Sequence, residues 1–267
     1  MPQQSPIGIF DSGVGGLSIA REIRNLLPNE DMLYYADSAY CPYGEKPPAD
    51  IKKRVFSLCD FLLSQGAKLL VVACNTASIV SLDDIRQRYQ VPVVGVEPAV
   101  KPAVAATKSG TIGVLATGVT LSGDRFSSLV ARYCHKTAVI TQPAPGLVEL
   151  VEKGKIQGNE AEQLLVKYLN PLLEQNADTI VLGCTHYPFL RPLIENIVGP
   201  NITIIDTGKA VARQTARLLK QMKLSCHDTT KPGKELFYTS ASQETVEQVV
   251  RLLWNDRSVK VKHMPLT

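Results

Sequence analysis

Short apolar runs alternate with helix-like segments along almost the whole chain of 267 residues. Residues 69–72 and 179–182 are two such runs, and each is followed by a small residue, a cysteine and a polar residue. Short aliphatic runs that are bounded by small and polar residues predict buried strands. Because strands that alternate with helices pair as a parallel sheet with helices on both faces, the sequence predicts an α/β fold.

Helical spacing fills most of the intervals between the expected strands. A glycine turn at residues 12–16 precedes apolar residues that recur at helical spacing from 17 to 27. Further helices are expected at residues 210–222 and 246–254, and residues 225–234 have the composition of a loop. We expect strands at residues 7–10, 32–35, 69–72, 93–96, 111–115, 138–141, 179–182, 203–205 and 237–240.

Two segments of the chain also resemble each other, which indicates an internal duplication. Ile7-Gly-Ile-Phe-Asp-Ser-Gly13 is similar to Ile112-Gly-Val-Leu-Ala-Thr-Gly118, with an offset of 105 residues from Ile7 to Ile112. The two cysteines that follow apolar runs, Cys74 and Cys184, lie 110 residues apart. Two offsets this close predict pseudo-symmetric halves, each with a first-strand loop and a cysteine loop in the same order. The alternative is that any two units of a parallel sheet look alike.

Turn-forming residues mark the boundaries of the two halves. Pro98, Pro102 and Gly110 indicate a break near residue 98, and Asp206-Thr-Gly208 indicates another. Because α/β proteins bind ligands at the carboxyl ends of their strands, we expect the active site in the cleft between two domains. The expected domains comprise residues 1–97 with 207–267, and residues 98–206.

Composition and charge argue against several classes of function. The formal net charge of +4 comes from scattered lysines and arginines, so neither nucleic acid nor a membrane is an expected partner. Residues 1–6 show no leader pattern and no stretch is apolar enough to span a membrane, which predicts a cytoplasmic protein. Six cysteines in such a chain predict free thiols.

The cysteine–histidine neighbours do not predict a metal site. Zinc ligands usually come in pairs that are spaced by about two to four residues. The three candidates here stand isolated along the chain, so we expect no metal. They are Cys134-His135, Cys184-Thr-His186 and Cys226-His227.

Cys74 and Cys184 are the candidate catalytic residues. Each is expected at a strand end, where α/β proteins keep their chemistry. Two thiols from two related halves can reach one carbon from opposite faces, which is what inversion of a stereocentre requires. The cysteines that we expect to be buried structural residues are Cys41, Cys59, Cys134 and Cys226.

Four motifs stand out along the chain: Phe10-Asp-Ser-Gly-Val-Gly-Gly-Leu17, Asp37-x4-Pro42-Tyr-Gly44, Ala73-Cys-Asn-Thr-Ala77 and Gly183-Cys-Thr-His-Tyr-Pro188, with Phe237-Tyr-Thr-Ser240 as a C-terminal match. They resemble the motifs of the glutamate racemases, in the order in which that family has them. The resemblance implies a cofactor-independent two-base enzyme that interconverts L-glutamate and D-glutamate and supplies D-glutamate for peptidoglycan. It implies that one thiolate removes the α-hydrogen while the other thiol protonates the opposite face, with Cys74 assigned to D-glutamate and Cys184 to L-glutamate.

Three further side chains are candidate proton partners of the thiols. Asp11 ends the first expected strand, and the resemblance pairs it with Cys74, although an aspartate there can also be a helix N-cap. His186 lies two residues after Cys184, and imidazole suits proton transfer at neutral pH. Glu152 resembles the family's glutamate near the same thiol, with a solvated helix charge as the alternative.

Substrate binding must hold an ammonium and two carboxylates without a rigid charged clamp. Hydroxyls, amides and backbone N–H groups at helix N-termini can do this. Ser18 replaces the last glycine of a dinucleotide fingerprint, and no lysine lies at a comparable strand end, so we expect neither a nucleotide nor pyridoxal phosphate. The positions that match the family's binding residues are Asp11, Ser12, Tyr43, Gly44, Asn75, Thr76, Thr117, Thr120, Thr185 and His186.

The resemblance also has implications for partners, and it leaves two other functions open. It implies a homodimer and, for some members, a peptidoglycan-precursor nucleotide as activator. Two rival functions stay open: a racemase for aspartate or another acidic compound, and an inactive protein that retains the fold. The Pro-Tyr-Gly and Thr-His-Tyr-Pro motifs favour glutamate, and the presence of both cysteines, Asp11 and His186 favours an enzyme.

Overall fold

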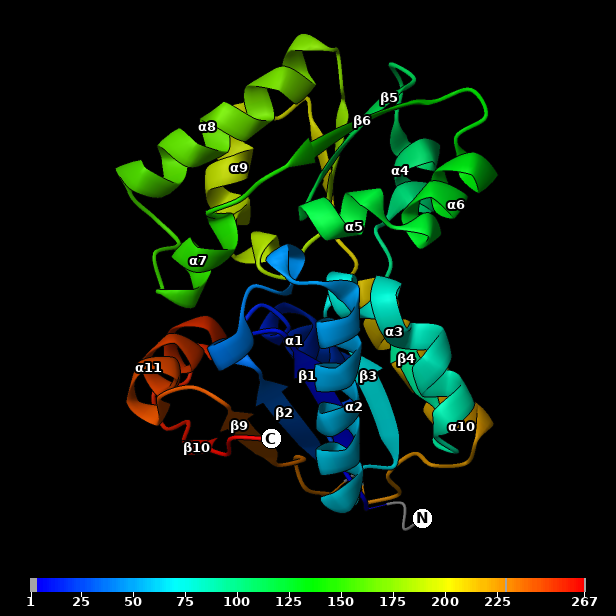
Figure 1. Cartoon of the computed structure of the whole chain (residues 1–267), viewed down its shortest axis with the longest axis vertical. Helices are drawn as coiled ribbons and strands as arrows, with labels where there is room; N and C mark the ends of the chain where they lie inside the picture. The colour runs from blue at the N-terminus through cyan, green and yellow to red at the C-terminus, as the bar shows by residue number, and fades with distance from the viewer. Residues whose placement is uncertain (1–3, 229, 267) are drawn as a thin grey trace.

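A six-stranded parallel sheet forms the lower half of the molecule in Figure 1. The computed structural model describes residues 4–228 and 230–266. The strand order in this sheet is β10-β9-β2-β1-β3-β4, and every pairing is parallel. Its strands are β1 (Ile7–Asp11), β2 (Met32–Ala36), β3 (Leu69–Val72), β4 (Val93–Gly95), β9 (Glu235–Thr239) and β10 (Val261–His263).

A four-stranded parallel sheet forms the upper half, in the order β6-β5-β7-β8. This order repeats the segment β2-β1-β3-β4 of the first sheet, so β5 corresponds to β1 and β7 to β3. The duplication that the sequence predicts is therefore present in the topology. The strands are β5 (Thr111–Ala116), β6 (Ala138–Pro143), β7 (Thr179–Leu182) and β8 (Thr203–Ile205).

Five helices cover the two faces of the first sheet. Phe10 and Leu70 point into one apolar core, while their neighbours Ile9 and Val71 point into the other, as the alternation of a strand requires. The first core is covered by α2 (Pro48–Ser64) and α3 (Asn75–Arg88). The second core is covered by α1 (Leu17–Leu26), α10 (Gly208–Gln221) and α11 (Gln243–Trp254).

The second sheet is covered on both faces as well. Val114 and Val181 pack on one side, and Leu115 and Leu182 on the other. The first side carries α4 (Val100–Ala106) and α6 (Asp124–Tyr133), and the second carries α7 (Leu147–Glu152), α8 (Asn159–Glu174) and α9 (Arg191–Val198). The short elements are α5 (Gly118–Ser122), η1 (Ser38–Tyr40), η2 (Tyr43–Glu45) and η3 (Tyr187–Leu190).

The predicted α/β class is confirmed, and each predicted strand is present with its ends within two residues. The sequence does not predict β10, because this short strand has a lysine between Val261 and His263 and so lacks an apolar run. The C-terminal segment returns to the first half as predicted, since β9 pairs with β2. The domain boundaries at 97/98 and 206/207 fall between β4 and α4 and between β8 and α10, and they stay a prediction.

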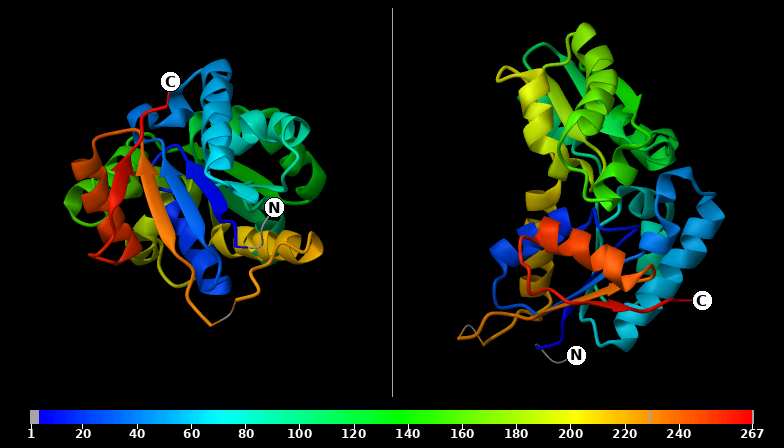
Figure 2. Two further views of the ribbon diagram at one scale, coloured as in Figure 1. Left: turned by 90° about the horizontal axis from the view of Figure 1, so that it is seen from below. Right: turned by 90° about the vertical axis from the view of Figure 1, so that its left-hand side faces the viewer.

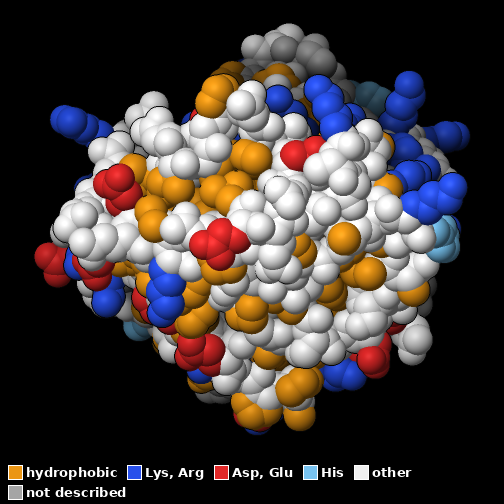
Figure 3. Space-filling model, turned by 90° about the horizontal axis from the view of Figure 1, so that it is seen from above, with side chains coloured by type: hydrophobic (Ala, Val, Ile, Leu, Met, Phe, Trp, Pro, Cys, Tyr) orange, Lys and Arg blue, Asp and Glu red, His pale blue; other side chains and the backbone are white. Residues whose placement is uncertain are grey.

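The two halves are stacked along the long axis of the molecule (Figure 1), and the left-hand view of Figure 2, which looks along that axis, shows helices on either side of the first sheet. Seen from the end that carries the second sheet, basic side chains gather toward the upper right of the face, while apolar side chains and scattered acidic ones occupy its centre and left (Figure 3). Within the described residues, no helix combines the length and apolar character needed to cross a membrane.

Candidate active site

Loops that follow β1, β3, β5 and β7 enclose a small cavity between the two halves. The cavity measures about 10 Å³, which is room for about one water molecule. The repeated topology thus brings both candidate thiols to the same place. The cavity is lined by Ser12, Pro42, Tyr43, Gly44, Cys74, Asn75, Thr76, Thr117, Val148, Gly183, Cys184, Thr185 and His186.

Cys74 is the N-cap of α3 and lies on the first-half side of the cavity. Its Sγ accepts a hydrogen bond from the Ala77 backbone N–H at 3.4 Å and lies 3.7 Å from the hydroxyl oxygen of Ser12. Burial raises the pKa of this thiol above its ordinary value and the nearby Asp11 carboxylate raises it further, while Ala77 and Ser12 lower it. The closed site therefore favours a protonated Cys74, and formation of the thiolate requires a group that takes the proton.

Asp11 is completely buried at the end of β1. Its Oδ2 accepts hydrogen bonds from the backbone N–H of Gly16 at 2.9 Å and of Gly13 at 3.3 Å, and the Thr185 hydroxyl donates to Oδ1 at 3.3 Å. Burial raises the pKa of Asp11, although the charge of His186 and the two N–H groups lower it. Among the residues that the structure describes, no hydrogen bond joins Asp11 directly to a cysteine, so its role beside Cys74 stays a prediction.

Cys184, His186 and Glu152 form a chain of contacts on the other side of the cavity. Nδ1 of His186 lies 3.7 Å from the sulfur of Cys184, and Nε2 lies 2.6 Å from Oε1 of Glu152. Glu152 also accepts hydrogen bonds from the Val14 backbone N–H at 2.6 Å and from the Ser38 hydroxyl at 3.0 Å. Glu152 is thus a paired group inside the site, and the alternative of a solvated helix charge is wrong.

The imidazole of His186 is buried, and burial alone would lower its pKa. Its contacts with Cys184, Cys41 and Glu152 outweigh burial and raise the pKa well above the ordinary value. A protonated His186 stabilises a thiolate at Cys184 and holds a proton within reach of that sulfur.

The glycine turn after β1 packs tightly against these side chains. A Cβ atom at Gly13 would lie 2.0 Å from Oε1 of Glu152, and one at Gly15 would lie 2.2 Å from Nδ1 of His186. Val14, between the two glycines, donates its N–H to the same carboxylate. These glycines therefore allow the turn to approach an acid and an imidazole, which explains the turn without a nucleotide.

Asn75 is buried at the first position of α3, and neither the nitrogen nor the oxygen of its side chain has a partner in the described part of the chain. Nearby, Oγ1 of Thr76 lies 3.0 Å from Oγ1 of Thr117 and 3.2 Å from Oγ1 of Thr120. Because buried polar groups are nearly always hydrogen-bonded to protein or to ordered water, the amide of Asn75 is available to bind a ligand or a water molecule.

Tyr43 lines the cavity, but its hydroxyl group is hydrogen-bonded to another residue of the first half. It donates to Oδ2 of Asp37 at 2.5 Å, and the same carboxylate is held by the guanidinium of Arg54 at 2.8 and 2.7 Å. The next residue, Gly44, lies so close to the second half that a Cβ there would be 2.6 Å from Cβ of Thr117. The Asp37–Arg54 pair therefore anchors this loop within the first half, and Gly44 lets the loop approach the opposite half.

A family model described as Asp/Glu/hydantoin racemase matches residues 15–215. The chain belongs to this family. The glutamate racemase of Ectopseudomonas mendocina is 50% identical to it over 257 residues, which cover 96% of this chain and 97% of that protein. The glutamate racemase of Pseudomonas entomophila is 49% identical over 266 residues, or 99% of both chains.

Solved structures of the racemase family share the fold. The glutamate racemase isoform RacE1 of Bacillus anthracis has a TM-score of 0.88 and 30% identity, covering 99% of this chain and 98% of that one. The Escherichia coli glutamate racemase, solved with L-glutamate and the activator UDP-MurNAc-ala, has a TM-score of 0.87 and 34% identity, covering 98% and 99%. The resemblance that the motifs indicate is confirmed.

The residues predicted from the racemase resemblance converge on the cavity, and all but three of them line it. Asp11, Glu152 and Thr120 lie behind the lining, and each contacts a lining residue: Thr185, His186 and Thr76, respectively. The remaining lining residues were not predicted as site residues, although Pro42 and Gly183 lie within two of the motifs. They are Pro42, Val148 and Gly183.

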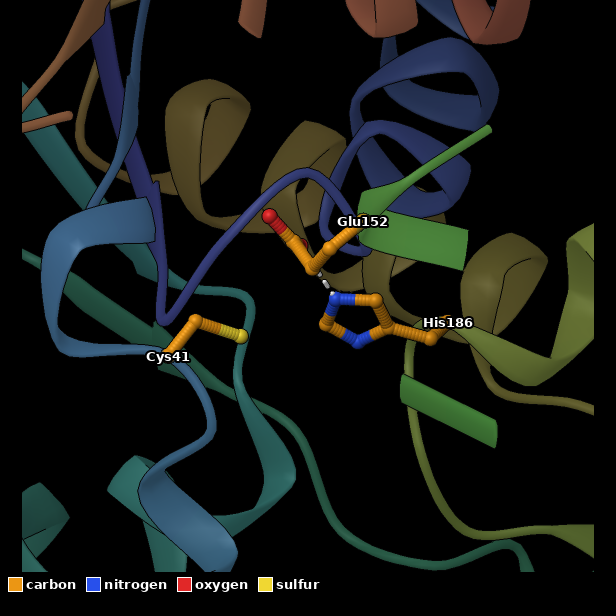
Figure 4. Close-up of side chains that lie close together, drawn as sticks. All are labelled: Cys41, Glu152 and His186. Atoms are coloured by element: carbon orange, nitrogen blue, oxygen red, sulfur yellow. Dashed lines mark hydrogen bonds and ion pairs between the residues drawn. The ribbon is translucent and has the colours of Figure 1, made fainter. Parts of the chain in front are cut away.

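Cys41 lies at the edge of the site, a position that sequence reasoning missed. We expected it to be a buried structural cysteine, whereas it is only partly buried and lies beside Glu152 and His186 (Figure 4). Burial and the charge of Glu152 raise the pKa of Cys41, and contact with His186 lowers it. The raising effects are the larger, and the resulting pKa is about 12. Its place next to Pro42, at the start of the Pro-Tyr-Gly motif, was the signal that could have found it.

Proposed function

We propose that this protein is a glutamate racemase in which Cys74 and Cys184 act from opposite faces of the substrate α-carbon. One observation carries the proposal. Two buried thiols, one from each half of a duplicated fold, line a single cavity, and each has different neighbours that can handle a proton. Relatives that are about half identical over nearly their whole length are glutamate racemases, which supports glutamate as the substrate.

Inversion requires one proton to leave one face and another to arrive at the opposite face. From L-glutamate, the thiolate of Cys184 takes the α-hydrogen as a proton, and the electron pair of the broken bond stays on the α-carbon. The thiol of Cys74 then protonates that carbon from the other face and becomes a thiolate. From D-glutamate the two cysteines exchange roles, and in our proposal Asp11 and His186 restore their protonation states.

The carbanion needs electrostatic help, because an α-proton is far less acidic than a thiol. Cys74 and Asn75 stand at the first turn of α3, where unpaired backbone N–H groups and the helix dipole favour negative charge. A protonated His186 supplies positive charge at the other thiol. Both sources are fixed before the substrate arrives, so they cost little reorganisation during the reaction.

Glutamate is held by neutral groups in this proposal. Within the described chain, no lysine or arginine lines the cavity. The Asn75 side chain offers a donor for a carboxylate and an acceptor for the ammonium, and both are without other partners. The hydroxyls that can bind the remaining oxygens belong to Ser12, Thr76, Thr117 and Thr185.

The halves must separate to admit the substrate. A cavity of about 10 Å³ is far too small for glutamate. Because its wall consists of loops from both halves, a small relative movement of the two sheets enlarges it. Substrate binding then recloses the site and excludes water from the reacting atoms.

We also propose the cellular setting that the resemblance implies. The product D-glutamate would serve peptidoglycan synthesis in the cytoplasm, and the enzyme would act as a homodimer. The E. coli relative was solved with the activator UDP-MurNAc-ala, and a similar precursor is a candidate activator here. Light scattering tests the dimer, and titration of the racemisation rate with the precursor tests activation.

Racemisation in deuterated water tests the proposed activity. The reduced protein is incubated with L-glutamate, and separately with L-aspartate, while optical rotation and α-deuterium are followed. We expect loss of rotation and one deuterium at the α-carbon with glutamate, and little change with aspartate. Preference for aspartate would support the rival racemase, and no change with either substrate would support an inactive member of the fold.

A further inference from the structure

Three metal-ligating side chains meet at the edge of the proposed active site. Cys41 lies between η1 and η2, Glu152 ends α7, and His186 follows β7. One ligand atom from each lies within 4.8 Å of the other two. Figure 4 shows the sulfur and the carboxylate on the same side of the imidazole. These residues are more than 30 positions apart in the sequence, so no spacing motif reveals the cluster.

We propose that Cys41, Glu152 and His186 form a binding site for an inhibitory Zn²⁺ ion. Thiolate, imidazole and carboxylate are the ligands that zinc takes in proteins, and three of them leave a fourth position for water. Zinc bonds of about 2.0–2.3 Å place the atoms of a tetrahedral site about 3.3–3.6 Å apart. The three side chains need to move by only about 1 Å to satisfy this geometry, and the thiol proton passes to solvent on binding.

The two nitrogens of His186 face different partners. Nδ1 lies toward Cys184 at 3.7 Å, while Nε2 contacts Glu152 at 2.6 Å. The metal would take Nε2 and replace that hydrogen bond with two bonds to the ion. His186 then no longer exchanges a proton through Nε2, and the chain from Cys184 to Glu152 is interrupted.

The ligands also come from different halves of the molecule. Cys41 belongs to the first sheet's half, and Glu152 and His186 belong to the second. A bound ion would therefore tie the halves together around a cavity of about 10 Å³, which is closed to the substrate. Inhibition by this route rests on the proposed function, whereas binding of the ion does not.

Solvent can reach the cluster. Cys41 is partly buried, and the side chain of Glu152 keeps 16% of its surface exposed although His186 is covered. An ion can thus reach the cluster from solvent at the carboxylate of Glu152. This arrangement predicts that the metal site is filled in the closed form.

Binding of Co²⁺, a spectroscopic substitute for Zn²⁺, tests the site directly. We expect the wild-type protein to bind one Co²⁺ with a thiolate-to-metal absorption band, which Zn²⁺ abolishes by competition. Cys41→Ser should lose the band, whereas Cys184→Ser should keep it. Cys134→Ser is the matched control, because this thiol is also partly buried but lies at the end of α6.

Glu152→Gln and His186→Asn should each weaken Co²⁺ binding by more than about tenfold, the usual cost of losing even an outer-shell partner. Zn²⁺ should inhibit racemisation by the wild type, with recovery on chelation, and Cys41→Ser should resist it relative to its own metal-free rate. Absence of the cobalt band in the wild type, or its persistence in Cys41→Ser, would overturn the proposal. A Cys41-dependent band in a protein that does not racemise glutamate would support the metal site and refute the proposed function.

Discussion

Nε2 of His186 lies 2.6 Å from Oε1 of Glu152, on the side of the imidazole ring opposite the contact with Cys184. The same carboxylate oxygen accepts the N–H of Val14 from the first half of the molecule. Glu152 therefore orients the histidine beside the second thiol and also ties the loop around that histidine to the first strand's turn.

Glu152→Gln should weaken the hydrogen bond with the carboxylate that helps to raise the pKa of His186. The protonated imidazole is then lost at lower pH, so the alkaline limb of the rate profile for L-glutamate should move to lower pH. We expect kcat to fall by about 100-fold, at the low end of what positioned acid–base groups contribute. Glu149→Gln, on the same helix, is the control and should leave the profile in place.

The same substitution predicts a change in the pH dependence of stability. Because the folded pKa of His186 is raised, its stabilisation is complete below the unfolded value of about 6.5 and is lost as the pH rises through the folded pKa. Urea unfolding at a series of pH values should show a smaller decline toward alkaline pH in Glu152→Gln. An unchanged decline would mean that Glu152 does not set this pKa.

Gly15→Ala should displace the imidazole of His186, since its Cβ would lie 2.2 Å from Nδ1. A shift of about 1 Å in a reacting group commonly costs about 100-fold in rate. Gly118→Ala is the matched control, because nothing lies within 4 Å of a Cβ there. Racemisation by the two purified variants measures the difference, and equal rates would contradict the role of the glycine turn.

The fold could be predicted from the sequence because the strands are short apolar runs at regular intervals. The run that precedes Cys74 and the run that precedes Cys184 are buried on both sides, so each stands out against its flanks. The sequence does not predict the strand Val261–His263, because this strand lies at the edge of the sheet, where its lysine and histidine are exposed. Edge strands do not need apolar residues on both faces.

Asn75→Ala should weaken substrate binding without destabilising the free protein. The side-chain amide has no partner in the described structure, so its removal breaks no hydrogen bond there. We expect KM to rise by about 10- to 100-fold, the equivalent of about 1–3 kcal/mol for a polar contact to substrate. In contrast, Ser78→Ala on the same helix breaks contacts with Val72 and Val96 and should lower stability.

Glu30→Gln should destabilise the protein by about 3–5 kcal/mol, because it removes the carboxylate that faces a buried lysine charge. Nζ of Lys68 lies 2.5 Å from this carboxylate and its side chain is fully buried. Glu30 lies just before β2 and Lys68 just before β3, at the opposite ends of these strands from the cavity, so kcat should not change. Urea unfolding is the measurement, and Glu160→Gln in an exposed pair should have little effect.

The site was harder to predict from the sequence than the fold. Cys74 lies in one short motif, and Cys184 and His186 lie together in another, so the order of these motifs along the chain predicts that they come close. Glu152 reaches the histidine from the end of α7 within the second half, and Cys41 reaches it from a loop of the first half, so only tertiary packing brings the three together. No short sequence pattern predicts a contact between residues from different halves of the molecule.

Proton exchange by single-thiol variants tests the central claim most directly. Each remaining cysteine can remove and return a proton on one face only. In deuterated water, Cys184→Ser should exchange the α-proton of D-glutamate with retention, Cys74→Ser should exchange that of L-glutamate, and neither should racemise. Near-wild-type racemisation by either variant, or exchange of the opposite enantiomer, would contradict the assignment of the two thiols.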